Sequence, residues 1–204
     1  MILKICGITN QEDAAAAIAA GATAIGFNFY PPSPRYIDPE HAREIAAAPG
    51  VRRVGVFVNQ APARVSEIAR IAELDVAQLH GDEMPSDYPV SLPVWKAARV
   101  GETFSFADYD NCPAEALLLD GPAAELYGGG GRCFDWRLAA PSARRIILAG
   151  GLDASNVARA IELAHPWGVD ACSRIESAPG RKDHGKMNAF LQAARAAAIV
   201  DIRT

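Results

Sequence analysis

The chain has 204 residues, half of them hydrophobic, which is enough for a sizeable globular core. Its formal net charge is -4 and its sequence pI is about 5.6, with no basic stripe, which argues against nucleic acid as a partner. The longest apolar runs are too short to cross a bilayer, and the N-terminus does not have the pattern of a secretory signal peptide.

The four cysteines, Cys6, Cys112, Cys133 and Cys172, are widely spaced. They form no CxxC pair and match neither a zinc spacing nor a redox motif. We therefore expect reduced thiols, a cytoplasmic protein and no metal site. An anionic metabolite remains a candidate ligand, because a local cluster of donors can bind phosphate even on an acidic protein.

Eight short β-branched or apolar runs recur along the chain and are predicted as strands. They are Ile2–Ile5, Ala24–Phe29, Arg53–Val58, Val76–Leu79, Val94–Ala97, Ala116–Leu119, Arg145–Ala149 and Val169–Cys172. Continuous apolar runs of this kind are typical of parallel strands that are covered on both faces.

Alanine-rich stretches with helical periodicity separate these runs. Thr9-x-x-Glu12 predicts a capping box at the first helix, and Asp38-Pro39 predicts the start of the second. Asp153 is the expected cap of the seventh helix, and the last helix should run from about 184 to 198. The fourth and sixth helices are only weakly indicated.

Strand-then-helix units at a spacing of roughly 25 residues predict a single-domain (β/α)8 TIM barrel over residues 1–204. The main alternative is a doubly wound open sheet, which usually carries a GxGxxG fingerprint after its first strand. Gly7-Ile8-Thr9 does not match that fingerprint. The glycine run at 128–131 is interpreted as a loop within one unit rather than a domain boundary.

Polar and glycine residues gather at the ends of the predicted strands, where a core would prefer apolar side chains. In chain order they are Lys4, Cys6, Asn28, Arg35, Asn59, Gln78, His80, Lys96, Asp120, Gly150, Gly151, Asp170 and Ser173. Any one of them alone would be interpreted as a buried polar residue with a structural role, whose hydrogen bonds are satisfied within the protein. Because the C-terminal strand ends of a barrel surround its active site, their convergence favours a functional site there.

Lys4 and Cys6 lie two residues apart on the first predicted strand, so both project to one face. A free cysteine is most often a small buried hydrophobe, and that interpretation stays open. The alternative is a thiolate base or nucleophile, which needs a positive neighbour such as Lys4.

Asp120 directly follows the apolar run at 117–119. It is interpreted either as a group that makes a cap or loop hydrogen bond or as a general acid. We expect the first and sixth strands to stand on opposite sides of the ring. A base on Cys6 and an acid on Asp120 would then act on two ends of one sugar.

Gly150-Gly151 follows the seventh predicted strand, and Ser173-Arg174 follows the eighth. Glycines let backbone amides approach an anion, and these two loops are the usual phosphate site of a barrel. Arg35, in a proline-rich loop, is either a solvated surface residue or a guanidinium that binds a carboxylate through two hydrogen bonds. His80 is a candidate ligand or base, although scattered histidines argue against a metal site.

Together these residues resemble the phosphoribosylanthranilate isomerase family of tryptophan biosynthesis. The matching stretches are KICGIT at 4–9, GFNFYPPSPRYI at 26–37, RVGVFVN at 53–59, QLHGDE at 78–83, LLLD at 117–120, YGGGGRCFDW at 127–136, LAGGL at 148–152 and PGRKDH at 179–184. They cover the chain from end to end and in order.

The resemblance implies a cofactor-free Amadori rearrangement of N-(5-phosphoribosyl)anthranilate, in which Asp120 opens the furanose as general acid. Cys6 is then the general base that removes the proton from C2 of the Schiff base. By the same resemblance Arg35 binds the anthranilate carboxylate. Backbone amides near Gly150, Gly151 and Ser173 bind the phosphate. The pocket is lined by Gln78, His80 and Asp170, with Lys4 beside the base.

Arg174 departs from the family pattern, which usually has a small residue after this serine. Its side chain either adds a bond to the phosphate or points to solvent. Two other hypotheses remain: a different phosphate-binding barrel, such as a sugar-phosphate epimerase or an indole-glycerol-phosphate synthase relative, and a binding module without turnover. We expect a monomer, because no surface helix carries an excess of large apolar residues.

Overall fold

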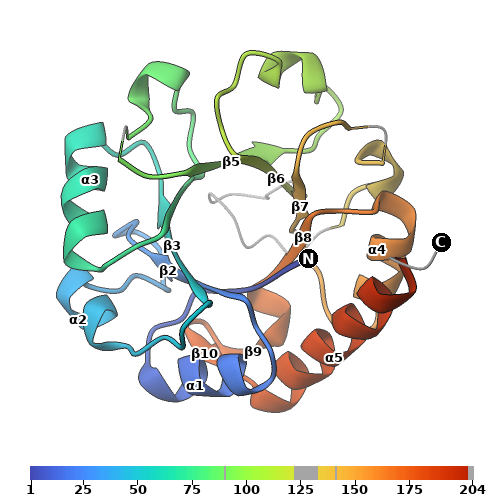
Figure 1. Ribbon diagram of the computed structural model, residues 1–204, viewed down its shortest axis with the longest axis horizontal. Helices are drawn as coiled ribbons and strands as arrows, with labels where there is room; N and C mark the ends of the chain where they lie inside the picture. The colour runs from blue at the N-terminus through green and yellow to red at the C-terminus, as the bar shows by residue number, and fades with distance from the viewer. Residues whose placement is uncertain (90, 122–132, 141, 202–204) are drawn as a thin grey trace.

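The computed structural model of the protein describes residues 1–89, 91–121, 133–140 and 142–201. Its centre is a closed barrel in which each parallel strand pairs with the next in sequence and the eighth returns to the first. Figure 1 looks into this ring, with the helices on its outer side. The arrangement is the predicted (β/α)8 barrel. The glycine run at 128–131 lies outside the described residues.

The barrel strands are β1 (Ile2–Cys6), β2 (Ala24–Asn28), β3 (Arg52–Phe57), β4 (Val76–Leu79), β5 (Val94–Arg99), β6 (Ala116–Asp120), β7 (Ile146–Leu148) and β8 (Gly168–Ala171). Each overlaps its predicted run, with ends that differ by at most two residues, so the strand predictions are confirmed. After β8 the chain forms an antiparallel pair, β9 (Glu176–Ala178) and β10 (Arg181–Lys182).

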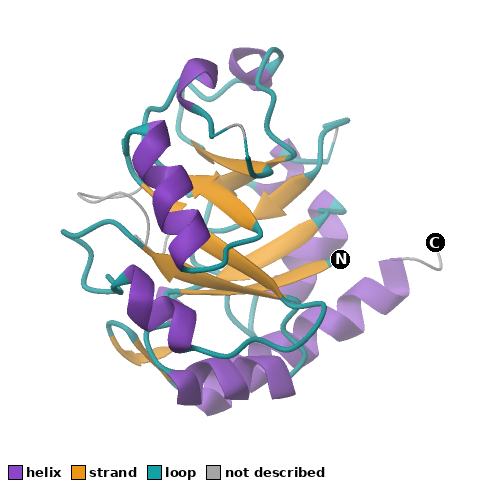
Figure 2. Cartoon of the chain, turned by 60° about the vertical axis from the view of Figure 1, so that its left-hand side comes forward, coloured by secondary structure: helices purple, strands orange, loops and turns teal. Residues whose placement is uncertain are grey.

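The helices outside the barrel are α1 (Gln11–Ala19), α2 (Pro39–Glu44), α3 (Pro62–Ile71), α4 (Val157–Ala164) and α5 (His184–Asp201). Short 3-10 turns are η1 (Pro85–Asp87), η2 (Phe106–Tyr109), η3 (Trp136–Leu138) and η4 (Ser173–Ile175). Figure 2 shows the helices packed around the strands from the side. In the part of the chain that the structure describes, no helix combines the length and the apolar character needed to span a membrane.

The start of α1 differs from the predicted capping box. Asn10, and not Thr9, caps the helix, because its side chain accepts a hydrogen bond of 2.8 Å from the Asp13 amide. The Thr9 hydroxyl instead donates to the Gly180 carbonyl at 2.6 Å, which ties the loop after β1 to the β9–β10 turn. A long-range contact therefore outcompetes the local cap.

The other two predicted helix starts have different outcomes. Asp38 caps α2 as predicted, accepting from the Glu40 amide ahead of a proline at the first helical position. Asp153 does not cap α4, which begins only at Val157. Its carboxylate accepts instead from the Ser155 amide at 2.8 Å and holds a turn ahead of the helix.

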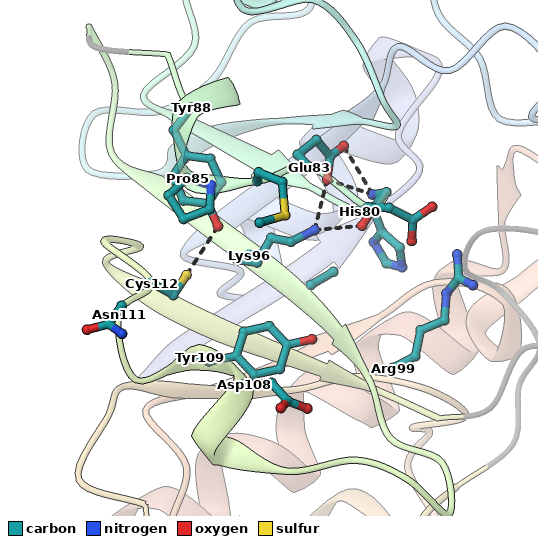
Figure 3. A pocket seen from close by; sticks show the side chains of 14 residues that line it. His80, Glu83, Pro85, Tyr88, Lys96, Arg99, Asp108, Tyr109, Asn111 and Cys112 are labelled. Carbon is teal, nitrogen blue, oxygen red and sulfur yellow. Dashed lines mark hydrogen bonds and ion pairs between the residues drawn. The ribbon is translucent and has the colours of Figure 1, made fainter.

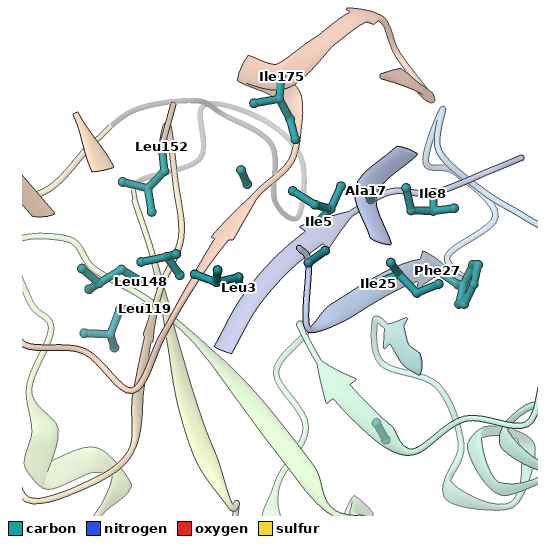
Figure 4. Packing of buried hydrophobic residues seen from close by; sticks show 14 of the residues in the cluster. Leu3, Ile5, Ile8, Ala17, Ile25, Phe27, Leu119, Leu148, Leu152 and Ile175 are labelled. Carbon is teal, nitrogen blue, oxygen red and sulfur yellow. The ribbon is translucent and has the colours of Figure 1, made fainter. Parts of the chain in front are cut away.

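The alternation of side chains along the strands divides the buried apolar residues into two layers. On β6, Leu117 and Leu119 point outward and pack under the helices, whereas Leu118 points into the barrel against Trp95 and Ile147. Figure 4 shows part of the outer layer. The inner layer fills the part of the barrel toward the N-terminal strand ends. The C-terminal strand ends are therefore left for polar side chains.

Arg53 on β3 closes the ends of two helices. Its guanidinium donates to the carbonyls of Ala42 in the last turn of α2 and of Ile45 directly after it, each at 2.6 Å, and to Ala72 after α3, at 3.0 and 3.1 Å. The last carbonyls of a helix have no partner within the helix. One side chain therefore satisfies the termini of two neighbouring helices.

Replacing this side chain should cost stability. We expect Arg53→Met to lower the free energy of unfolding by about 2–4 kcal/mol, because the carbonyls of three buried residues lose a charged donor. Denaturant unfolding would measure the loss. Arg43→Ala is the control, because Arg43 is 59% exposed and its partner Glu73 is 64% exposed, so its removal should cost at most about 1 kcal/mol. Equal losses in the two variants would contradict the assignment.

Candidate active site

The two-residue period of the strands turns a set of polar side chains into the barrel above its inner core. Ala116 and Leu118 of β6 belong to that core, so Asp120 on the same strand also faces inward. The same alternation applies to β1, β4 and β8. The inward-facing polar residues at these strand ends are Lys4, Cys6, Gln78, His80, Asp120, Asp170 and Cys172.

Lys4 and Asp170 form an ion pair inside the barrel. The ammonium donates to Asp170 Oδ1 at 3.0 Å, and the Lys4 side chain has no solvent exposure. Burial alone would lower the pKa of Lys4, but the charges of Asp170 and Cys6 outweigh it and raise that pKa. Burial also raises the pKa of Asp170 to about 7, with the nearby Cys6 and Asp120 adding to the effect against Lys4. Lys4 is therefore a permanent cation at this site.

Cys6 lies directly above this cation. A Cβ built on Gly26 would lie 3.0 Å from Cys6 Sγ and 3.1 Å from Lys4 Nζ, so both groups reach over the same glycine of β2. The pKa of the Cys6 thiol is lowered well below its ordinary value, first by a hydrogen bond from Cys172 and then by the charges of Lys4 and Lys182, although burial opposes them. This environment favours the thiolate at neutral pH.

Asp120, His80 and Gln78 form a second polar group on β4 and β6. His80 Nε2 lies 3.3 Å from Asp120 Oδ2, and the Gln78 amide donates to His80 Nδ1 at 3.2 Å. Within the described ranges, Gln78 Oε1 is a buried polar atom without a hydrogen-bond partner, and His80 Nε2 makes no hydrogen bond beside its 3.3 Å ion-pair contact with Asp120. Buried polar groups are rarely left unpaired, so these two atoms mark a place for a polar ligand.

The two strands that carry Cys6 and Asp120 are not diametrically opposite. In the closed ring β6 is three strands from β1 through β8 and β7, and β5 stands opposite β1. The expected positions across the ring are therefore corrected to a closer arrangement. Asp170, on β8, lies between the two strands in the ring, and, in addition to burial, the charges of both Cys6 and Asp120 raise its pKa.

Arg35, after β2, is held by a carboxylate that the sequence patterns did not indicate. Its Nε and Nη2 donate to the two oxygens of Glu176 at 2.9 and 2.8 Å, a bidentate pair. Glu176 also accepts from Lys182 Nζ at 2.8 Å. Arg35 is thus a fixed, 15% exposed side chain and not a solvated surface residue.

The loops after β7 and β8 lie at neighbouring strand ends. Gly150 and Gly151 have φ angles of +76° and +70°, a conformation that favours glycine. Ser173 begins the turn η4. Arg174 Nη1 lies 3.2 Å from Asp153 Oδ2, an ion pair that links the two loops.

Lys96 does not join the barrel mouth. Its neighbours in register, Leu79 and Leu117, belong to the outer layer, so Lys96 also points outward. There it donates to Glu83 at 2.8 Å and to the Gly81 carbonyl at 2.6 Å, beside a cavity of about 470 Å³ shown in Figure 3. The strand-end rule failed here because it ignored which face the side chain takes. Among the described residues, no three His, Cys, Asp or Glu side chains form a group that could hold a metal ion.

The sequence model of one protein family, described as N-(5'phosphoribosyl)anthranilate (PRA) isomerase, matches residues 3–193. The chain belongs to the PRA isomerase family. A PRA isomerase of Solibacter usitatus (strain Ellin6076) is 75% identical over 197 residues, which are 97% of this chain and 98% of that relative.

Solved PRA isomerase structures share the fold along their whole length. The crystal structure from Thermotoga maritima has a TM-score of 0.88 at 40% identity and covers 96% of this chain and 100% of its own. A PRA isomerase in complex with reduced 1-(o-carboxyphenylamino)-1-deoxyribulose 5-phosphate has a TM-score of 0.85 at 38% identity, with coverage of 96% and 100%.

Three residues of this PRA isomerase family member escaped the sequence analysis as site candidates: Cys172, Glu176 and Lys182. Cys172 ends the eighth predicted strand and lies two residues after Asp170, so it faces the same way, and that spacing is the signal that could have found it. Lys182 stands within the PGRKDH stretch at 179–184, which carries the family resemblance. Their contacts with Cys6 and Arg35 depend on chain closure and have no local signal.

The environment of Cys6 makes a prediction for its titration. Because its pKa is lowered, the thiolate should persist as the pH falls below about 8.5, the ordinary thiol value, and disappear only when the pH passes the lowered pKa. The pH dependence of Cys6 alkylation by iodoacetamide, followed on its peptide by mass spectrometry, would measure this.

Lys4→Met should move that alkylation curve to higher pH, because the nearest cation is lost. Lys186→Met is the matched control, since Lys186 is 56% exposed and pairs with Asp183. A midpoint for the unaltered protein at or above about 8.5 would contradict the lowered pKa.

Proposed function

We propose that the protein catalyses the Amadori rearrangement of N-(5-phosphoribosyl)anthranilate to 1-(2-carboxyphenylamino)-1-deoxyribulose 5-phosphate, the third step from chorismate in tryptophan biosynthesis. The observation that carries the proposal is a thiol and a carboxyl, Cys6 and Asp120, facing one barrel mouth in a member of the PRA isomerase family. A related PRA isomerase has been crystallised with the reduced product, which supports a ligand of the same class here.

The first half of the reaction opens the sugar ring. Asp120 gives a proton to the furanose oxygen, the bond from that oxygen to C1 breaks, and the anthranilate nitrogen forms a protonated Schiff base with C1. His80, 3.3 Å from the carboxyl, positions this acid. The unpartnered Gln78 Oε1 would take up a hydroxyl group of the sugar, and His80 Nε2, which makes no hydrogen bond of its own, would contact another beside Asp120.

The second half moves a proton from carbon. The Cys6 thiolate takes the proton from C2, the electron pair shifts toward the nitrogen, and the resulting enol tautomerises to the ketone. Lys4 keeps the base anionic before the step. Asp170 in turn holds Lys4 in place through the 3.0 Å ion pair. General bases positioned in this way typically contribute about two to four orders of magnitude in rate.

The ends of the substrate carry negative charge and need fixed donors. Backbone amides near Gly150, Gly151 and Ser173 would bind the phosphate, where the positive φ angles of the glycines turn the chain sharply. Arg35 would bind the anthranilate carboxylate. Because Glu176 occupies its Nε and Nη2, the carboxylate would meet the remaining nitrogen, Nη1.

The remaining features follow from the resemblance and the composition. We propose that residues 1–204 act as one domain, that the reaction needs no cofactor, and that the protein is a cytoplasmic monomer. Light scattering on the purified protein, with and without product, tests the oligomeric state. A stable dimer mass would overturn that part of the proposal without touching the chemistry.

If Asp120 is the acid and Cys6 the base, replacing either one should lower turnover by a similar factor. Cys6→Ala and Asp120→Asn should each lower turnover by about two orders of magnitude or more, because each removes one proton-transfer group. The loss of substrate fluorescence with freshly made phosphoribosylanthranilate measures turnover. Circular dichroism checks that the barrel is still folded.

Two controls keep the assay specific to the site. Cys112→Ala removes a thiol outside the barrel mouth, and Asp110→Asn changes an exposed carboxyl. Both should retain near-normal turnover. Full activity of Cys6→Ala would refute the base assignment, and no turnover by the unaltered protein would refute the proposed function.

Arg174 provides a separate test of the phosphate site. If its guanidinium adds a bond to the phosphate beside its ion pair with Asp153, Arg174→Gly should raise KM roughly tenfold, equivalent to about 1.4 kcal/mol. Steady-state kinetics measure the change. Unchanged KM would mean that Arg174 serves only to link the two loops.

A further inference from the structure

A second thiol lies next to Cys6. In the pairing of β1 with β8, Lys4 stands opposite Asp170 and Ile5 opposite Ala171, and Cys6 and Cys172 directly follow this last pair, with a hydrogen bond between their thiols. Because side chains alternate along a strand, the two thiols point into the barrel like Lys4 and Asp170, but two residues closer to the C-terminal ends of the strands. They are therefore direct neighbours across the seam that closes the barrel.

The spacing suits a disulfide. Paired strands lie about 4.8 Å apart, and the Cα atoms of a disulfide usually lie roughly 4.4–6.8 Å apart. A Cβ built on Gly7, the residue after Cys6, would lie 3.1 Å from Cys172 Sγ. The Cys172 sulfur thus rests against the backbone that carries Cys6.

The charges around the two thiols favour one thiolate and one thiol. Lys182 Nζ lies 3.9 Å from Cys172 Sγ, Lys4 lies below Cys6, and Arg35 packs on Gly7. The pKa of Cys6 is lowered, and the pKa of Cys172 is raised, because the proton shared between the sulfurs stays on Cys172. A thiolate beside a proton-bearing partner is the arrangement of a nucleophilic cysteine with its resolving thiol.

We propose that Cys6 and Cys172 are an oxidative modification site, a dithiol that a peroxide converts reversibly into a disulfide across the β1–β8 seam. The consequence for activity rests on the proposed function, because the disulfide removes the base. The formation of the bond does not depend on that function.

The chemistry proceeds in two steps. The Cys6 thiolate attacks one oxygen of hydrogen peroxide, the O–O bond breaks, and the departing hydroxide takes a proton to become water, which leaves a sulfenic acid. Cys172 Sγ then attacks Cys6 Sγ, the S–O bond breaks, and the hydroxide leaves as water with the Cys172 proton. Two thiols are oxidised and one peroxide is reduced to two waters.

The exposure of the two thiols and a reducing compartment both suit this chemistry. Cys172 is partly exposed and Cys6 is 9% exposed, both at the C-terminal ends of their strands. A peroxide is small enough to enter a mouth that admits a sugar phosphate. In a reducing compartment a disulfide is usually transient, so thiols would restore the base and the protein would lose activity only during oxidation.

The test uses a full-length variant in which these are the only cysteines, Cys112→Ser with Cys133→Ser. Treatment with hydrogen peroxide should remove both free thiols and leave a protein two hydrogens lighter, with Cys6 and Cys172 joined in the peptide map. Isomerase activity, relative to the same protein before oxidation, should fall at least about tenfold and return with dithiothreitol.

The matched control adds Cys172→Ser to the same variant. It should gain oxygen at Cys6 and never lose two hydrogens, and dithiothreitol should restore less of its activity once Cys6 is oxidised beyond the sulfenic acid. The peptide map of the oxidised unaltered protein gives the same answer without any substitution.

Three results would overturn the proposal: two free thiols left on Cys6 and Cys172 of the two-cysteine variant after peroxide treatment, or, in the unaltered protein, oxidation of Cys133 while Cys6 and Cys172 stay free, or a peptide map that joins other cysteines. Failure of the proposed function is seen separately, as absent turnover in the fully reduced protein, and the mass measurement still decides whether the disulfide forms.

Discussion

The ion pair between Lys4 and Asp170 is the interaction on which the site depends. A fully buried ammonium is costly unless a charged partner satisfies it, and Asp170 does so at 3.0 Å. Because β1 and β8 meet only when the ring closes, this pair forms only in the complete barrel. The event that completes the fold therefore also sets a positive charge beneath Cys6.

The charges above that pair follow from it. Burial raises the pKa of Asp170 to about 7, and the negative charges of Cys6 and Asp120 add to this rise. The positive charges of Lys4 and Lys182 favour the thiolate of Cys6 on one side of the barrel mouth. Beside them, Glu176 accepts hydrogen bonds from both Arg35 and Lys182. On the proposed function, a ligand with a phosphate and a carboxylate would meet donors at its ends and the proton-transfer groups between them.

Local sequence rules succeeded where the chain's own neighbours decide the structure. Each predicted strand is present, because an apolar run needs cover on both faces wherever it stands. The cap at Asp38 formed, whereas Thr9 bonded to Gly180 and left Asn10 as the cap. Lys96 was misplaced, since its outward direction follows from a register that only the paired strands define.

The sequence by itself determined the barrel, its order of strands, and the places of Lys4, Cys6 and Asp120 at strand ends, because the apolar runs and the residues that follow them are local signals. Only the tertiary structure decided how these groups meet others. Arg35 binds Glu176, far along the chain, and Cys6 lies beside Cys172 across the closing seam. Such contacts join residues separated by most of the chain, so ring closure alone brings them together.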